Sequence, residues 1–67
     1  MKLQKGQIWT KDGKDFVVHE VVGDEVFGLL YYSKDRGNID AETTDYVFRR
    51  TPLEKFVNEK ATLVEVE

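Results

Sequence analysis

The chain has 67 residues and no cysteine, with 13 acidic against 10 basic residues and a formal net charge of −3. This length predicts one domain, residues 1–67, with a small core and modest stability. The composition excludes disulfides and thiolate zinc sites, and it lacks both the basic excess of a general nucleic-acid binder and the dense carboxylates of a DNA mimic.

The amino-terminal segment carries charge but no apolar core typical of a secretory signal. The sequence also has no apolar run long enough to span a bilayer. We therefore expect a cytoplasmic protein without a membrane-inserted segment, in which Met1 to Lys5 form a frayed or edge segment.

The first expected element is a short strand over residues 7–10, which Gly6 opens. Asp12 and Gly13 then form a turn, because both residue types tolerate left-handed backbone. The strand that begins near Phe16 completes a first hairpin.

The strongest local signal is a second hairpin from Asp15 to Ser33. Two β-branched and aromatic runs flank Gly23 and Asp24, and glycine at the first loop position is typical of a tight hairpin turn. The apolar spacing skips one residue, which predicts a β-bulge at His19–Glu20 opposite Gly28. The expected inner face comprises Phe16, Val18, Val21, Val26, Leu30 and Tyr32, and the opposite face Phe27, Leu29 and Tyr31. In the expected register Phe16 lies opposite Tyr32 and Val18 opposite Leu30.

The remaining elements are a loop, a strand, a helical turn and a last strand. The polar run from Lys34 to Glu42 predicts an exposed loop. Residues 43–50 form a strand with Tyr46 and Phe48 on one face. Thr51 would cap a short helix over residues 52–58, with Glu54 completing a capping box, and residues 61–66 form a closing strand.

These elements predict an all-β fold: a small, five-stranded, strongly bent barrel of the Src-homology-3-like group, including KOW and Tudor-type barrels, with one short helical turn before the last strand. An oligonucleotide-binding-type barrel fits less well, because it normally needs more residues and a helix between its third and fourth strands.

Three segments carry a resemblance to a protein group. They are Gly6-Gln-Ile-Trp9, then the Phe16 to Val26 hairpin, then Phe48-Arg49-Arg50-x-Pro52-Leu53-x-x-Phe56. Together they resemble short bacteriophage and prophage accessory proteins. The resemblance implies a protein that binds and modulates or inhibits a host protein, and it implies no catalytic residue or cofactor. The loop from Lys34 to Glu42 departs from the tighter versions of this pattern.

The residues offer little for catalysis or metal binding. His19 is the single histidine and Ser33 the single serine, so no nucleophile is placed beside a base by the sequence. The oxygen-bearing residues Asp35, Asn38, Asp40 and Glu42 surround Gly37, but their order is not that of a calcium loop. We expect no enzymatic activity, no cofactor and no metal.

Two binding functions remain. The favoured one is protein binding through Phe27, Leu29 and Tyr31, unless these residues form a second small core under Leu53 and Phe56. Their expected rim is Lys34, Arg36, Asp40, Arg49 and Arg50. An acidic, apolar surface suits a basic host protein, and edge pairing into a homodimer is a further option.

The alternative function is binding of single-stranded or structured nucleic acid. Arg49 and Arg50 would begin a basic edge that Lys34, Arg36, Lys55 and Lys60 extend. Aromatic side chains would offer stacking surfaces to the bases, namely Trp9, Phe27, Tyr31 and Tyr46. Carboxylates lie close to these basic residues in the sequence and would repel phosphate.

Overall fold

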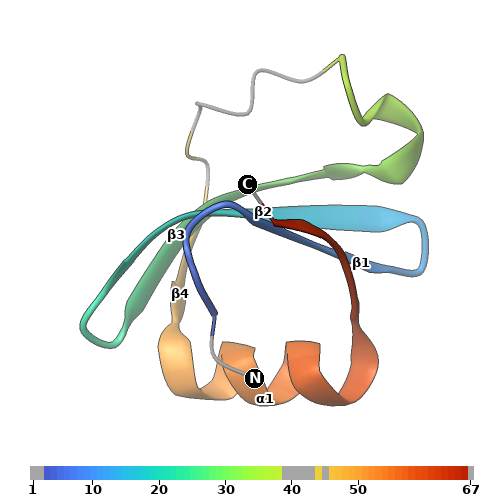
Figure 1. Ribbon diagram of the computed structural model, residues 1–67. Coiled ribbons are helices and arrows are strands. Elements are labelled where there is room, and N and C mark those ends of the chain that lie inside the picture. Colours follow the sequence, from blue (N-terminus) through green and yellow to red (C-terminus); the bar gives the residue numbers. More distant parts are fainter. Residues whose placement is uncertain (1–2, 39–43, 45, 67) are drawn as a thin grey trace.

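The computed structural model describes residues 3–38, 44 and 46–66. In chain order the elements are β1 (Gln7–Lys11), β2 (Lys14–Val22), β3 (Glu25–Tyr32), the 3-10 turn η1 (Ser33–Asp35), β4 (Tyr46–Arg49), α1 (Arg50–Lys60) and β5 (Thr62–Val66). The strands form one antiparallel sheet in the order β4-β3-β2-β1-β5. The sheet curves around α1, which lies on its concave side (Figure 1).

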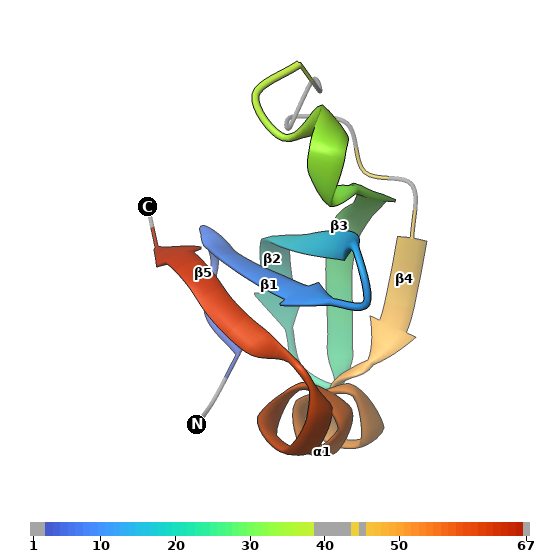
Figure 2. The same ribbon diagram turned by 90° about the vertical axis from the view of Figure 1, so that its right-hand side faces the viewer.

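The expected five strands and the helix before the last strand are confirmed, but a closed barrel is not. Within the described residues, β4 pairs only with β3 and β5 pairs only with β1, so the sheet is open. Figure 2 shows β4 and β5 at opposite edges of the sheet, with α1 passing beneath. The connection from β4 to β5 therefore runs across the concave face through the helix.

Both predicted hairpin turns are confirmed. Asp12 (φ 52°) and Gly13 (φ 78°) are both left-handed between β1 and β2, as a type I′ turn requires. Between β2 and β3, Gly23 has φ 58° at the first loop position, as expected for a type II′ turn.

The predicted bulge in β2 is also present, but the predicted register beyond it is wrong by two residues. The register shifts between Val18 and Glu20, so that Val18 pairs with Gly28 and Phe16 with Leu30. Tyr32 consequently lies opposite Lys14 rather than opposite Phe16. The extra residue restores the alternation, and Phe16, Val18 and Val26 enter one core.

The core lies between the concave face of the sheet and α1. Its buried members are Leu3, Trp9, Phe16, Val18, Val26 and Val57, and half-buried side chains of Val21, Phe48, Leu53, Ala61 and Leu63 pack against them. The expectation that Met1 to Lys5 are frayed is wrong for Leu3, because its side chain is 2% exposed. Residues 1–2 lie outside the described part of the chain.

The helix is longer than the sequence indicated and begins differently. It has 11 residues and its N-cap is Arg49, with no side-chain capping bond. Thr51 and Pro52 thus lie within the first turn, where proline is tolerated because the N–H groups there have no intrahelical partner. Glu54 is not part of a capping box; its carboxylate accepts a hydrogen bond from the Leu3 N–H at 2.8 Å.

Candidate functional site

The predicted partner surface on β3 is only partly accessible. The register places Phe27, Leu29 and Tyr31 on the face opposite to Val26, as expected. Leu29 is nevertheless buried at 5% exposure, while Phe27 and Tyr31 are half-buried. Ile8 and Val17, its neighbours across β1 and β2, are buried as well, so Leu29 belongs to a small apolar layer on the convex face. That layer lies on the face of the sheet away from α1, so it is not a second small core under Leu53 and Phe56.

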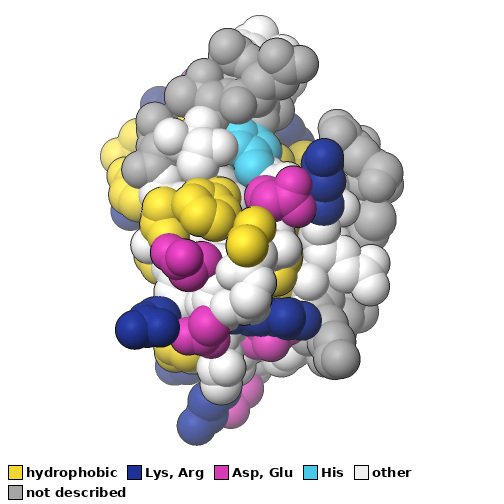
Figure 3. Space-filling view, turned by 90° about the vertical axis from the view of Figure 1, so that its left-hand side faces the viewer, with side chains coloured by type: hydrophobic (Ala, Val, Ile, Leu, Met, Phe, Trp, Pro, Cys, Tyr) yellow, Lys and Arg dark blue, Asp and Glu magenta, His cyan; other side chains and the backbone are white. Residues whose placement is uncertain are grey.

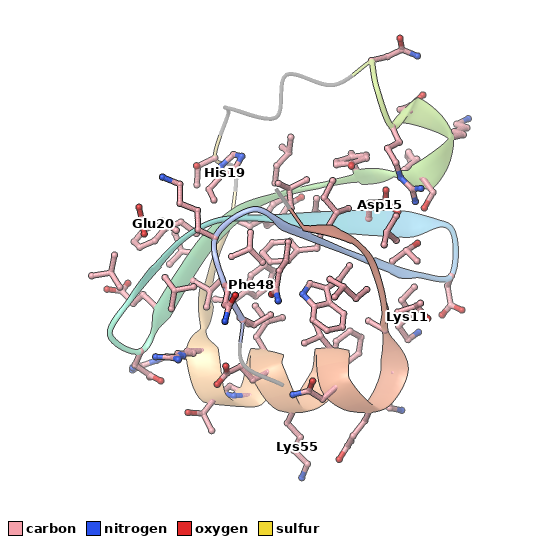
Figure 4. The ribbon with its side chains drawn as sticks, viewed as in Figure 1. Lys11, Asp15, His19, Glu20, Phe48 and Lys55 are labelled. Carbon is pink, nitrogen blue, oxygen red and sulfur yellow. The ribbon has the colours of Figure 1, made fainter. Side chains whose placement is uncertain are left out.

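Arg36, expected at the rim of that surface, is engaged with the sheet. Its guanidinium donates to both carboxylate oxygens of Asp15, from Nε at 2.5 Å and from Nη2 at 2.9 Å. The Ser33 hydroxyl donates to the same carboxylate at 2.5 Å. Figure 4 shows Asp15 directed to the convex side of the sheet, where η1 lies. These bonds attach η1 to β2.

Asp15, Ser33 and Arg36 form a cluster in which the carboxylate and the guanidinium balance each other's charge. Hydrogen bonding from Arg36 outweighs burial and lowers the pKa of Asp15 to about 2. Burial, with the Asp15 carboxylate nearby, raises the pKa of Tyr31. Asp15 is thus a fully ionised, fully buried carboxylate whose charge is matched by a guanidinium. A carboxylate with so low a pKa is a poor general base near neutral pH.

The other predicted basic residues lie at the opposite end of β3. Arg49 Nη1 donates to Asp24 Oδ2 at 2.9 Å, and Arg50 Nε lies 3.5 Å from Glu54 Oε1. Arg49 pairs with Glu25 at the start of β3, whereas Tyr31 is near its end, about 20 Å along the strand. The arginines therefore do not join Lys34 and Arg36 in one rim. Asp40 lies outside the described residues.

The surface near His19 is mixed in character. His19 Nδ1 lies 2.6 Å from the Thr44 hydroxyl. Figure 3 shows hydrophobic side chains close to this histidine, with acidic and basic side chains interspersed below them. Among the described residues, no three His, Cys, Asp or Glu side chains lie together in a way that would hold a metal ion.

A groove lies on the other face of the sheet, between α1 and the β1–β2 hairpin. It has a volume of about 690 Å³. Its apolar walls are formed mainly by Trp9, Phe16, Leu30, Phe48, Leu53 and Phe56. Lys11, Asp12, Lys14 and Arg49 are the ionisable residues along its edge. We call this feature the aromatic groove.

Local structure explains how these walls form. Leu53, Phe56 and Val57 are spaced to share one side of α1, and Val57 is buried while Phe56 remains 44% exposed. Phe48 on β4 packs edge-on against Phe16, with ring centroids 5.4 Å apart. Figure 4 shows Phe48 on the side of the sheet that α1 covers. The indole N–H of Trp9 donates to Gln7 Oε1 at 3.1 Å, which fixes the ring without using a groove residue.

The apolar surface continues beyond the helix along the same face of β3. A second hollow of about 170 Å³ is lined by Lys14, Leu30, Tyr31, Tyr32 and Tyr46, and it shares Lys14 and Leu30 with the aromatic groove. Leu30 is 37% exposed and Tyr32 56% exposed. Leu30 and Tyr32 thus lie on the same face of β3 as Val26, as predicted. However, α1 covers only the part of that face near Val26.

Sequence reasoning missed the aromatic groove because it treated the inner face as fully covered. One signal was available: a helix of one or two turns cannot cover an eight-residue strand from end to end, since a helix rises about 1.5 Å per residue and a strand about 3.3 Å. This difference in length predicts exposed aromatic residues on the face of β3 that carries Leu30 and Tyr32.

Comparison with protein families, with curated proteins and with solved structures found no match. The resemblance to phage accessory proteins thus has only the residues quoted for it as support. In the described part of the chain, no helix has the length and apolar character needed to cross a membrane.

Proposed function

We propose that this chain is a non-enzymatic protein-interaction module that holds a segment of another protein in the aromatic groove. The observation that carries this proposal is an open apolar groove of about 690 Å³ with exposed Phe56 and Leu30 on opposite walls. Apolar grooves with a charged edge are typical of sites where a partner buries its side chains. Aromatic walls of this kind concentrate binding energy in a few contacts.

The groove takes the place of the surface expected on the convex face. Leu29 is buried, and Phe27 and Tyr31 expose only part of their rings. By contrast, Phe56, Leu30 and Tyr46 are each more than a third exposed and border continuous hollows. The concave face therefore offers a partner exposed apolar side chains that border a groove.

The paired arginines favour a protein partner over nucleic acid. Arg36, Arg49 and Arg50 each lie within 4.0 Å of a carboxylate, which reduces their attraction for phosphate. Trp9, one of the proposed stacking residues, is 5% exposed. A base would have little access to its ring.

We also propose a fold relationship and a cellular location for this chain. The strand order β4-β3-β2-β1-β5 with a helix before β5 supports assignment to the Src-homology-3-like group, although the sheet is open. Together with the resemblance to phage accessory proteins, this supports a phage-encoded protein that modulates or inhibits a host protein in the bacterial cytoplasm.

Peptide selection tests this function directly. A random peptide library is selected against the immobilised chain, and binders are titrated against the wild type, Phe56→Ala and Leu30→Ala. Lys55→Ala is the matched control, because this helix residue points away from the sheet (Figure 4). We expect both groove variants to stay folded by circular dichroism and to lose binding, while the control retains it.

Two outcomes would contradict the proposal. One is that no peptide is selected. The other is that the selected peptides bind Phe56→Ala and Leu30→Ala as tightly as the wild type. Sedimentation of the chain alone at rising concentration shows whether a second copy occupies the groove, and a dimer that Phe56→Ala dissociates would replace the foreign partner with a second copy.

A further inference from the structure

We propose that the segment held in the aromatic groove is acidic, with carboxylates beside its apolar anchors, and that Lys14 and Lys34 bind these carboxylates. This inference rests on the proposed function, because it specifies the chemistry of the partner at the same groove. It is opposite in sign to the basic partner that the net charge of the chain suggests.

Two lysines contact a single exposed ring in the smaller hollow that adjoins the groove. Lys14 Nζ lies 5.9 Å from the centroid of the Tyr32 ring, and Lys34 Nζ lies 5.7 Å from the same centroid. Both distances fall within the range of cation–π contacts. Lys14 also lines the aromatic groove and the adjoining smaller hollow. Two positive charges are thus held beside Tyr32, which lines the smaller hollow that shares Lys14 and Leu30 with the groove.

These charges are not neutralised within the described part of the chain. Lys11 pairs with Asp12 and Arg49 with Asp24, whereas none of the described ion pairs involves Lys14 or Lys34. The aromatic ring attracts an ammonium group through its quadrupole but carries no net charge. Within the described part of the chain, neither lysine is therefore held by a carboxylate, which leaves both ammonium groups for carboxylates of a partner.

The charge of the groove also differs from that of the whole chain. Its edge carries Lys11, Lys14 and Arg49. Lys11 is paired with Asp12 and Arg49 with Asp24, so Lys14 is the cation at this edge that has no ion pair among the described residues, although the chain has a net charge of −3. Acidic residues of a partner would thus find positive charge at the groove and predominantly negative charge elsewhere. Complementary charge of this kind selects partners and orients them more than it adds affinity.

The test extends the peptide selection. We expect selected peptides to combine aromatic or aliphatic residues with Asp or Glu, and to contain few Lys or Arg. One selected peptide is then synthesised in two forms, as selected and with each Asp and Glu replaced by Asn and Gln. Binding of both forms is followed by the fluorescence of Trp9, the single tryptophan, which lines the groove.

The lysines are tested by a double-variant comparison. For the acidic peptide, we expect Lys14→Gln/Lys34→Gln to raise the Kd by roughly threefold to tenfold. This is the loss in affinity that corresponds to two solvent-exposed ion pairs. The neutral peptide should bind the wild type and this variant equally. Lys55→Gln/Lys60→Gln removes the same charge from exposed positions of α1 and should leave the Kd of the acidic peptide nearly unchanged.

The outcomes separate this inference from the proposed function. If selected peptides require Phe56 but are neutral or basic, or if both lysine variants bind the acidic peptide alike, the acidic partner is wrong and the groove function stands. If the peptides do not require Phe56, the groove function fails and this inference fails with it. A single-stranded oligothymidylate that binds more tightly than the acidic peptide, and loses that binding in Lys14→Gln/Lys34→Gln, would overturn the inference in favour of nucleic acid.

Discussion

Gly28 lies so close to Phe16 that a Cβ atom added to the glycine would stand 2.6 Å from Cζ of the Phe16 ring. The same atom would stand 2.2 Å from the backbone oxygen of Val17. This contact follows from the bulge in β2, which shifts the pairing so that Val18 rather than His19 faces Gly28. The glycine is therefore required for close approach of the two strands.

We expect Gly28→Ala to lower the free energy of unfolding by roughly 2–4 kcal/mol, because a backbone oxygen cannot move aside without breaking the strand pairing. Urea denaturation followed by circular dichroism measures this change. Thr62→Ala, at an exposed strand position, is the control and should change stability by less than about 0.5 kcal/mol. Equal stability of the two variants would show that the strands do not approach as described.

Gly23 is required for its backbone conformation. At φ 58° it adopts the left-handed region, and a Cβ there would meet no atom within 4 Å. We expect Gly23→Val to cost roughly 1–3 kcal/mol, because a β-branched residue is strained at positive φ although space is available. Gly23→Asn should cost less, since asparagine tolerates this conformation. Identical melting temperatures for the two variants would contradict a left-handed backbone at this position.

The Asp15–Arg36 pair makes stability depend on acidity. The pKa of Asp15 is lowered from 3.8 to about 2 in the folded chain, chiefly by hydrogen bonding from Arg36. The unfolded state therefore binds the proton more readily, and the stabilisation is complete above about pH 5 and is lost as the pH falls from there to 2. We expect this contribution to be on the order of 2 kcal/mol.

Urea denaturation between pH 7 and pH 2 checks this dependence. Asp15→Asn should be less stable at pH 7 and should lose less stability between pH 5 and pH 2 than the wild type. Asp24→Asn removes an exposed carboxylate and should leave the steep acid dependence in place. An unchanged slope in Asp15→Asn would mean that other carboxylates cause the acid sensitivity.

Tyr31 distinguishes the convex face from the groove. Because its ring is half-buried beside Asp15, we expect Tyr31→Ala to lower the free energy of unfolding by roughly 2 kcal/mol, less than the 3–5 kcal/mol of a fully buried aromatic residue. Tyr31 lines the smaller hollow but not the aromatic groove, so peptides anchored in the groove should still bind this variant. A variant with full stability that no longer binds them would return the partner site to the convex face.

Much of the fold is encoded in local patterns. The turns at Asp12–Gly13 and Gly23–Asp24 depend on residue types that adopt positive φ, and the bulge follows from one skipped position in the apolar alternation. The alternation of Tyr46 and Phe48 also predicted their shared face, where their rings stack 5.9 Å apart. These features need only neighbours in sequence or across one hairpin.

The features that escaped prediction depend on contacts between distant segments. Thr51 and Glu54 match a capping box, yet Glu54 instead binds the N–H of Leu3, which is 51 residues away. Arg36 lies in a polar loop and reads as a surface charge until Asp15 is found buried beneath it. Exposure of Leu30 and Tyr32 depends on where α1 ends over the sheet. Residue types and their spacing in the sequence do not determine such tertiary contacts.

The pairing of β1 with β5 joins the two ends of the described chain and sets the order in which the domain can fold. Leu3 enters the core beside Val57, and residues 7–10 of β1 pair with residues 62–66 of β5. During synthesis the β2–β3 hairpin can form early, but the edge of β1 has no partner strand until β5 has left the ribosome. Contacts this distant slow folding, because a long loop must close before they form. A chain that ends before β5 would therefore present an open strand edge beside an incompletely covered core, which favours association with other chains.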